Sequence, residues 1–321
     1  MFRASRFVFS VAAMLSRRGS LLLVAGCLLA NICSARPLMW QVEKPGVSGE
    51  VYLFGSLHYG LPDFYPLPDY VMQAYEAADA LVVELDVDTL EQTDVAQLMT
   101  GLGYWPPANK ANQQPLKNLI GKKQWNLLAD KAADQGVDAE RFKNTRPWLV
   151  SMQLVSGQLR QTRFAATQGI DRYFIGLARE QKPILQLETF EQQIRTFSDI
   201  SETHQVALLA STLKDYEKAP EMLEKLATSW QQGNVDQLEK HIFTAFHGSD
   251  VGEVLYERVF TGRNEQMAAY IANKLAAPQR YFVVTGIGHM LGDDGLVCLL
   301  QRDGYRIQQY PPTETPLCPD V

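Results

Sequence analysis

The sequence predicts an α/β fold in which a mixed central β-sheet, made of two related halves, is flanked by helices and interrupted by a helical middle insertion. Two observations support this prediction. Short apolar segments typical of strands lie near both ends of the chain, and a long stretch between them has apolar residues at three-and-four spacing. In addition, one strand near each end finishes in Gly-x-x-His, as "GSLH" at 55–58 and as "GIGH" at 286–289.

The elements follow in order along the chain. The first half has expected strands at 39–43 and 50–56, a helix at 68–78 and a strand at 80–86. The polar, proline-bearing segment 103–115 is expected to connect two subregions of one domain.

The second half is expected to begin with a helix and a strand. Asp171 is a plausible N-cap for a helix to about Gln181, which leads into the strand "KPILQLE". Helices then fill about 190–274. The remaining elements are a strand at 280–285, a helix at 294–302 and a strand at 305–310.

Residues 1–35 have the pattern of a secretory signal peptide, with two arginines ahead of an apolar run that ends in small residues. We expect cleavage after Ala35, which leaves 36–321 as a single domain in a secreted or periplasmic location. The segment "LVAGC" leaves open a lipoprotein signal acylated at Cys27. Only in that case do we expect contact with a membrane.

Charge and cysteine content limit the remaining possibilities. The net charge is −6 and there is no basic block, which argues against nucleic acid as a partner. After cleavage only Cys298 and Cys318 remain. In an oxidising compartment they could form a disulfide, and the alternative of two free thiols stays open.

The repeated Gly-x-x-His motif predicts a functional site. In each half the strand is followed by a helix and another strand, a unit that should be parallel, so that both histidines lie beyond the carboxyl ends of sheet strands. Open α/β sheets place their ligands at that edge. We therefore expect His58 and His289 to approach within about 10 Å, a separation that leaves room for a metal ion with ligand bonds near 2 Å.

Carboxylates at strand ends complete the predicted site. Glu84 and Asp86 end an apolar strand with a spacing that aims both at one face, although Asp86 could simply be a solvated strand end. Glu188 has the same position in the second half. Two imidazoles with one or two carboxylates suit Zn²⁺, Mn²⁺ or Co²⁺, and the remaining carboxylate could take a proton from water.

The order of these motifs resembles the TraB/PrgY/GumN family, which is related to the Tiki metalloproteases and, more distantly, to erythromycin esterase-type hydrolases. The resemblance rests on "GSLH", "VVELD", "GID", "LQLET", "ERVFTGRNEQM" and "VVTGIGHMLGDD", and it covers almost all of 38–310. It implies an α/β fold with two related halves and, in the Tiki branch, a Mn²⁺- or Co²⁺-dependent peptidase. The family positions fall on Gly55, His58, Glu84, Glu188, Arg263, Asn264, Gly286 or Gly288, and His289.

Two of these positions allow alternatives. Arg263, expected at the start of a helix, could orient a substrate carboxylate or an oxyanion, or could form a salt bridge with Glu84 or Glu188. Asn264 could orient substrate or cap the same helix.

These features predict a secreted metal-dependent hydrolase that cleaves a peptide or another amide or ester bond. His58, His289 and Glu84 are the expected ligands of a divalent metal, and Glu188 is the expected general base. A non-catalytic protein that binds a peptide or small ligand is one alternative, and hydrolysis with a histidine base and no metal is another. The mature chain has no Gly-x-Ser-x-Gly, phosphate-binding loop or His-Glu-x-x-His motif, which disfavours serine hydrolases, kinases and ordinary zincins.

Overall fold

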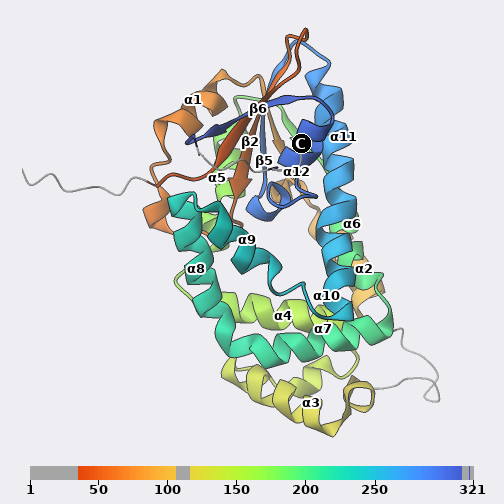
Figure 1. Cartoon of the computed structure of the whole chain (residues 1–321). Helices are drawn as coiled ribbons and strands as arrows, with labels where there is room; N and C mark the ends of the chain where they lie inside the picture. The colour runs from red at the N-terminus through yellow and green to blue at the C-terminus, as the bar shows by residue number, and fades with distance from the viewer. Residues whose placement is uncertain (1–34, 106–115, 313–317, 319–321) are drawn as a thin grey trace, which may run out of the picture. The chain divides into compact units, whose positions relative to one another are not determined.

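A computed structural model describes residues 35–105, 116–312 and 318 (Figure 1). The expected signal peptide with Cys27, except its last residue, and most of the loop expected at 103–115 lie outside the described residues. Within the described part of the chain, no helix has both the length and the apolar character needed to cross a membrane.

Six strands form one mixed sheet in the order β4-β3-β5-β2-β1-β6. Their bounds are β1 Met39–Glu43, β2 Glu50–Ser56, β3 Ala80–Val83, β4 Ile184–Gln186, β5 Arg280–Gly286 and β6 Arg306–Tyr310. The strands β4, β3, β5 and β2 are parallel to one another, whereas β1 is antiparallel to both β2 and β6. The predicted mixed α/β sheet is therefore confirmed.

The two halves interleave within this sheet. β2 and β3, from the first half, both pair with β5 of the second half, which lies between them. β6 has the same direction as β5, because it is antiparallel to β1 and β1 is antiparallel to β2. Both strand–helix–strand units are parallel as expected, but each encloses strands of the other half.

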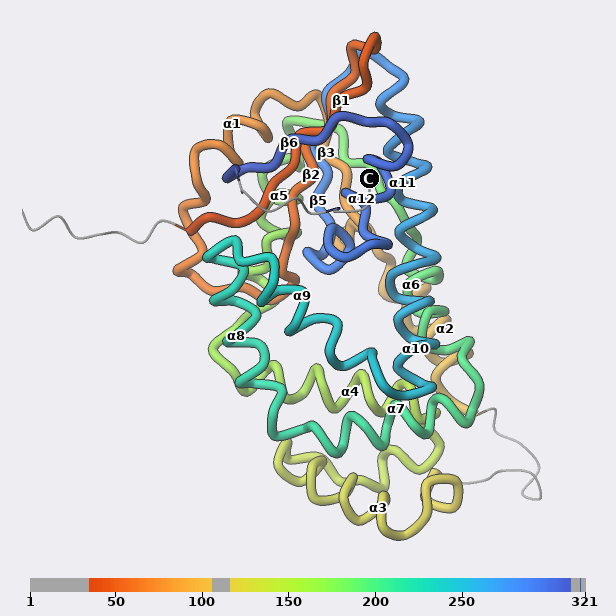
Figure 2. The backbone as a smooth tube through the Cα atoms, in the orientation of Figure 1, coloured from red at the N-terminus to blue at the C-terminus, as the bar shows by residue number. Residues whose placement is uncertain are grey.

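Helices cover both faces of the sheet. Their bounds are α1 Asp69–Ala77, α2 Gln92–Gly103, α3 Leu116–Asp134, α4 Pro147–Leu159, α5 Ile170–Ala178, α6 Phe190–Ser198, α7 Glu202–Asp215, α8 Ala219–Gln232, α9 Val235–Phe243, α10 Asp250–Tyr256, α11 Gly262–Leu275 and α12 Leu296–Arg302. Figures 1 and 2 show α1 and α5 on one side of the strands, with α11 and α12 on the other. The central strands are therefore buried on both faces, which explains their continuous apolar runs.

Aromatic side chains fill the layer between the sheet and α5. Phe174 packs 5.8 Å from Phe54 of β2 and 4.8 Å from Phe282 of β5, measured between ring centroids. Trp230 of α8 is fully buried against the same cluster, and its indole N–H donates to the carbonyl of Gly55 at 2.8 Å. This contact satisfies a buried donor and holds the end of β2, where the first histidine motif begins.

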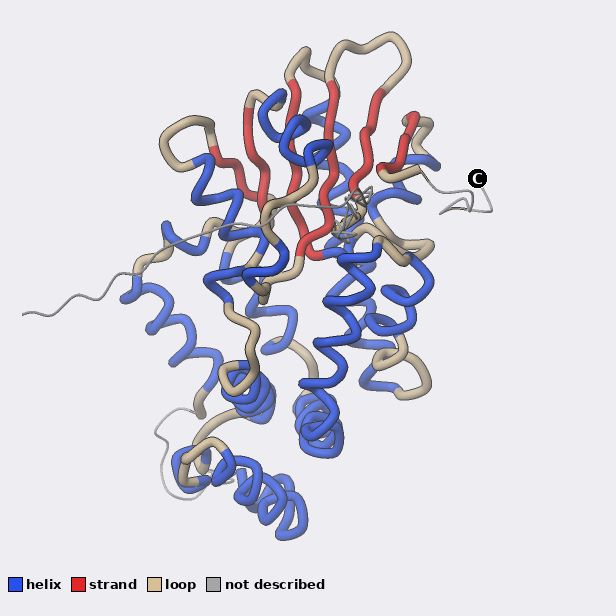
Figure 3. Tube along the Cα trace, turned by 90° about the vertical axis from the view of Figure 1, so that its left-hand side faces the viewer, coloured by secondary structure: helices blue, strands red, loops and turns tan. Residues whose placement is uncertain are grey.

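A second layer of helices, visible beyond the sheet in Figures 2 and 3, forms a separate apolar core. Its buried members include Leu128 of α3, Leu154 of α4 and Leu213 of α7. Met152 of α4 lines the same cavity as His58, so this layer also borders the carboxyl edge of the sheet.

Several expected element boundaries were wrong. β3 ends at Val83, because the chain leaves the sheet and Asp86 caps a 3₁₀ turn by accepting from the Asp88 N–H at 3.2 Å. Gly169, not Asp171, is the N-cap of α5. The helix around Arg263 does not begin there, because α10 continues into it through a π-helical turn at Glu257–Thr261.

The expected disulfide is present. Cys298 of α12 and Cys318 have Cα atoms 5.5 Å apart and are covalently joined. The alternative of two free thiols is therefore wrong.

Candidate active site

The ends of the two central strands place the two histidines. In the parallel pair of β2 and β5, Gly55 pairs with Thr285 and Ser56 with Gly286, so the two motifs are offset by one residue. A 3₁₀ turn at Ile287–His289 follows β5. Both histidines therefore lie just beyond the carboxyl edge of the sheet, as the sequence predicted.

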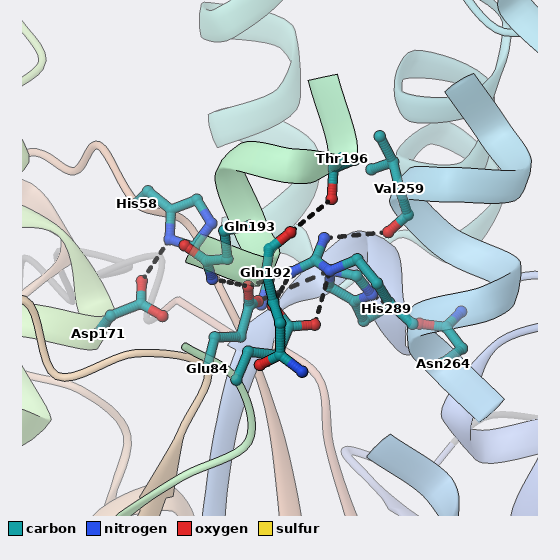
Figure 4. A network of polar contacts seen from close by, with 12 residues as sticks. His58, Glu84, Asp171, Gln192, Gln193, Thr196, Val259, Asn264 and His289 are labelled. Atoms are coloured by element: carbon teal, nitrogen blue, oxygen red, sulfur yellow. Dashed lines mark hydrogen bonds and ion pairs between the residues drawn. The ribbon is translucent and has the colours of Figure 1, made fainter. Parts of the chain in front are cut away.

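Gly286 lies where three side chains that could each donate an electron pair to a metal ion converge. A Cβ atom built on Gly286 would lie 3.4 Å from Glu84 Oε1, 3.6 Å from His58 Nε2 and 3.7 Å from His289 Cδ2. His289 Nε2 is 3.8 Å from Glu84 Oε1. The two rings are thus well inside the predicted separation, and Figure 4 shows His58 and His289 on either side of Glu84. We call the space beside Gly286 that these groups share the three-donor space.

Asp171 holds the His58 ring. Its Oδ2 lies 3.0 Å from His58 Nδ1, and its Oδ1 accepts from the Ser56 hydroxyl at 2.9 Å (Figure 4). The pKa of His58 rises from 6.5 to about 9, chiefly because the Asp171 charge favours the imidazolium. The ring is 61% exposed, so solvent reaches it and screens part of this attraction. Nε2 remains directed at the three-donor space.

Asn264 holds the His289 ring, which is buried. Asn264 Nδ2 donates to the carbonyl of Asp294 at 2.7 Å, so its Oδ1, 2.6 Å from His289 Nδ1, is the acceptor for that ring N–H. The Phe260 ring packs 5.5 Å away on the other side. Burial lowers the pKa of His289 to about 4, which leaves the ring neutral at pH 7 with a lone pair on Nε2.

Glu84 is the buried carboxylate of the site. Oε1 accepts from the Gly286 N–H at 2.7 Å, and Oε2 accepts from Arg263 at 2.9 Å. Burial alone would raise its pKa, but the two histidines, Arg263 and the Gly286 N–H together lower it from 4.5 to about 2. At neutral pH His289 is uncharged, so the His58 imidazolium, Arg263 and the Gly286 N–H are the groups that keep Glu84 ionised.

Arg263 joins the two glutamates. Its Nε and Nη2 donate to both oxygens of Glu188 at 2.7 and 2.9 Å, and Nη2 also reaches Glu84. Nη1 donates to the Val259 carbonyl, within the π-helical turn, at 3.0 Å. The salt-bridge alternative for Arg263 is thus present with both glutamates, and both oxygens of Glu188 are engaged.

Other expectations were wrong. Asp86 does not join Glu84, because β3 has already ended and Arg179 binds both of its oxygens at 2.8 Å. It is not a solvated strand end either, since only 2% of it is exposed. Asn264 lies inside a continuous helix and orients His289, so it is not a cap.

The three motif glycines lack a side chain for two different reasons. A Cβ at Gly55 would overlap the Ile287 side chain, and one at Gly288 would lie 2.8 Å from the Phe260 ring. These two glycines therefore permit packing. Gly286 alone of the three borders the donor groups.

The sequence of this chain is similar to those of known proteins. The TraB/PrgY/gumN family model matches residues 38–309. The chain belongs to the TraB/PrgY/gumN family. YbaP of Escherichia coli (strain K12), named an uncharacterized protein, is 26% identical over 262 residues, which are 81% of this chain and 91% of YbaP.

Two more distant relatives carry an activity in their names. The metalloprotease TIKI homolog of Amphimedon queenslandica is 22% identical over 341 residues, covering 89% of this chain and 64% of the relative. Metalloprotease TIKI2 of Danio rerio is 22% identical over 317 residues, covering 86% and 61%. The chain thus spans less than two thirds of the length of either TIKI protein. No solved structure matches the chain significantly.

Two residues of the site in this TraB/PrgY/gumN protein were not expected. Asp171 was taken for a helix cap, although it belongs to "GID", one of the segments that carry the family resemblance, and this was a signal. Gln193 of α6 has its Nε2 3.4 Å from Glu84 Oε2; "EQQ" at 191–193 is part of the family pattern, but no role was expected for Gln193.

The fit of a metal ion can be judged from the donors themselves. Across the described ranges, no group of three or more His, Cys, Asp or Glu side chains is arranged to hold a metal ion. Glu84 is engaged by Arg263 and Gly286, as described above. The histidines, however, are oriented as metal ligands commonly are, each with Nδ1 beside an oxygen acceptor, with His58 Nε2 beside Gly286 and His289 Nε2 beside Glu84. The chemistry of the groups beside Gly286, two imidazoles and one carboxylate, therefore suits a divalent ion.

Proposed function

We propose that this protein is a metal-dependent hydrolase that cleaves a peptide bond or a similar amide or ester bond. One observation carries the proposal. His58 Nε2, the His289 ring and a buried carboxylate meet around Gly286, His289 Nε2 lies 3.8 Å from that carboxylate, and an oxygen acceptor on Nδ1 fixes each ring. The names of the two TIKI relatives point to the same chemistry. Mn²⁺, Co²⁺ or Zn²⁺ suits such a set of nitrogen and oxygen donors.

In this proposal His58, His289 and Glu84 hold the ion. A divalent ion there would supply a Lewis acid that activates water and polarises the carbonyl to be attacked. His289 is neutral at pH 7 and needs no deprotonation, whereas His58 must lose a proton.

Glu188 takes a different role from the one expected. Both of its oxygens accept from the Arg263 guanidinium, and this ion pair favours the ionised carboxylate over one that has taken a proton from water. We therefore assign Glu188 to positioning Arg263, which in turn holds Glu84. Arg263 Nη1 carries a second N–H with no acceptor among the described residues, and this N–H could stabilise the negative charge that develops on the attacked carbonyl oxygen.

Hydrolysis without metal is the second candidate, and the His58–Asp171 pair favours it. An exposed imidazole held by a carboxylate can, once it is in its neutral form, take a proton from water and return it to the leaving group, so this activity should rise as pH approaches the His58 pKa of about 9. A chelator separates the two candidates, because it should abolish activity only in the first. A protein that merely binds its ligand would show no turnover under either condition.

Export is also part of the proposal and is tested separately. Secretion with cleavage after Ala35 would produce a mature chain that begins at Arg36. Intact-mass measurement of protein expressed in bacteria decides between that product and one that begins with acylated Cys27.

The main experiment fills the three-donor space. Gly286 has φ −51°, which alanine adopts without strain, and the contacts of its new Cβ would be ordinary ones of 3.4–3.7 Å. We expect Gly286→Ala to fold normally and to bind Mn²⁺, Co²⁺ or Zn²⁺ at least tenfold more weakly in calorimetry. Gly101→Ala, on α2 with nothing near its added Cβ, is the matched control.

Ligand variants complete the test. His58→Ala and His289→Ala should each lose most of the bound metal, measured by elemental analysis, together with any hydrolysis of a peptide library. The proposed metal site is refuted if wild-type protein binds none of the three ions stoichiometrically, or if Gly286→Ala binds them as tightly as wild type.

A further inference from the structure

A cavity of about 500 Å³ opens beside the three-donor space. His58, Glu84 and Arg263 line one end. Most of the remaining wall is apolar and comes from α4, α5, α6 and the turn after β3, with Leu85, Met152, Ile175, Phe190, Ile194 and Phe197 as its main members. The volume lies within the range of small-molecule pockets in proteins and has room for on the order of 15 water molecules.

The apolar side chains that line the cavity pack against a buried cluster. Ile194 is 5% exposed and belongs to a buried cluster with Trp148 and Leu149 of α4. Met152, Phe190 and Phe197 are partly buried and pack on that cluster. The wall is therefore preformed, and water in contact with it gains free energy by leaving when an apolar group enters.

The charges around the cavity are already paired. Arg263 binds Glu84 and Glu188, and the other lining arginine, Arg172, binds Asp88 at 3.0 Å. No lining cation in the described part of the chain is left over for an anionic ligand such as a phosphate or a fatty acid carboxylate. A neutral, apolar group matches the wall better.

We propose that this cavity receives a large apolar side chain, of leucine or phenylalanine size, from the peptide residue next to the bond at His58 and Glu84. This inference rests on the proposed function, because it takes the polar end of the cavity as the reacting centre. The apolar wall and these polar groups line one cavity, so a group that fills the cavity lies beside the bond that reacts. Specificity then comes from α4 and α6, neither of which contains a catalytic residue.

Binding without turnover tests the inference. The probes are N-acetyl-leucinamide, N-acetyl-phenylalaninamide and N-acetyl-alaninamide, titrated into metal-free full-length protein and followed by NMR chemical shifts. The first two should bind at least tenfold more tightly than the alanine compound, since each buries several more apolar carbons. Because no metal is present, a failure of catalysis does not affect this result.

Two variants locate the binding. Met152→Trp fills the cavity from α4 and should weaken leucinamide binding at least tenfold. Met222→Trp makes the same exchange on α8 at a side chain that is 42% exposed and lines none of this cavity, so it should bind as wild type does. If Met152→Trp does not fold by circular dichroism, Phe197→Ala takes its place, and it should weaken binding at least threefold by removing part of the wall.

The outcomes separate the two proposals. Apolar-dependent binding that Met152→Trp abolishes supports the pocket even if no hydrolysis is ever found. Equal binding of the three amides, no binding at all, or an equal effect of Met152→Trp and Met222→Trp overturns the pocket, whatever the metal experiments show. Hydrolysis of a peptide library with no preference for leucine or phenylalanine would also overturn it and leave the proposed hydrolase intact.

Discussion

Replacing Arg263 with methionine tests how the site carboxylates are kept in the protein interior. Methionine keeps the apolar stem of the side chain and removes the guanidinium. The change deletes three hydrogen bonds to Glu84 and Glu188 and one to the Val259 carbonyl. It leaves two carboxylate side chains, 6% and 7% exposed, without their shared cation.

The expected loss is large because the remaining charges are buried. Removing one partner from a buried ion pair typically costs about 3–5 kcal/mol, and here one cation serves two anions, so we expect the upper part of that range at pH 7. A surface arginine gives the contrast. Arg195 on α6 binds Glu191 at 2.7 Å and is 45% exposed, so Arg195→Met should cost far less stability than Arg263→Met.

The loss should also depend on pH with a definite sign. In the wild type the pKa of Glu84 is lowered to about 2, so its contribution is present above its ordinary value of 4.5 and is lost as pH falls toward 2. Without Arg263, burial raises the pKa of Glu84, and the variant gains stability as that carboxyl takes up a proton. The difference between the two proteins should therefore shrink between pH 7 and pH 4.5.

Urea unfolding, followed by tryptophan fluorescence at several pH values, measures these differences. The reasoning is refuted if Arg263→Met costs no more than Arg195→Met at pH 7. It also fails if the difference grows as the pH is lowered.

Three further predictions concern metal binding, the His58–Asp171 pair and the disulfide. Calorimetry at pH 7, in buffers of different ionisation enthalpy, should show that binding of one metal ion releases about one proton. The reason is that His58 has a pKa of about 9 and His289 one of about 4, so release of two protons would contradict a neutral His289. Asp171→Asn should lower the pKa of His58 toward 6.5 in an NMR titration, and an unchanged value would mean that Asp171 is not its cause. Cys298→Ser with Cys318→Ser should reduce the free energy of unfolding in urea by about 3 kcal/mol, since the bond closes a loop of 20 residues, and an unchanged midpoint would contradict this role.

Much of this fold could be predicted from the sequence because its strands are short, apolar and bounded by turn residues. β1 and β2 match their expected ranges, as does the placing of His58 and His289 beyond the carboxyl ends of central strands. These features depend on local pattern and on the rule for parallel connections, both of which a single sequence carries.

The remaining features depend on contacts between distant residues. Asp171 reaches His58 across 113 positions, and the Gly286 N–H reaches Glu84 across 202. Local spacing does not encode such pairs, so Asp171 was assigned to a local capping role. In the π-helical turn before Arg263, the Val259 carbonyl accepts a hydrogen bond from the Arg263 side chain, and no local sequence pattern indicates this contact.

The insertion of β5 between β2 and β3 has a consequence for the order of assembly. β5 begins at Arg280, so during synthesis most of the chain leaves the ribosome before the strand that fills the middle of the sheet exists. Until then β2 and β3 have open inner edges, and the turn that carries His289 has not been made. The donor set therefore forms only after nearly the whole chain has been synthesised. A nascent or partly translocated chain, or one truncated before β5, lacks this donor set. Any activity of the site can therefore begin only after the fold is complete.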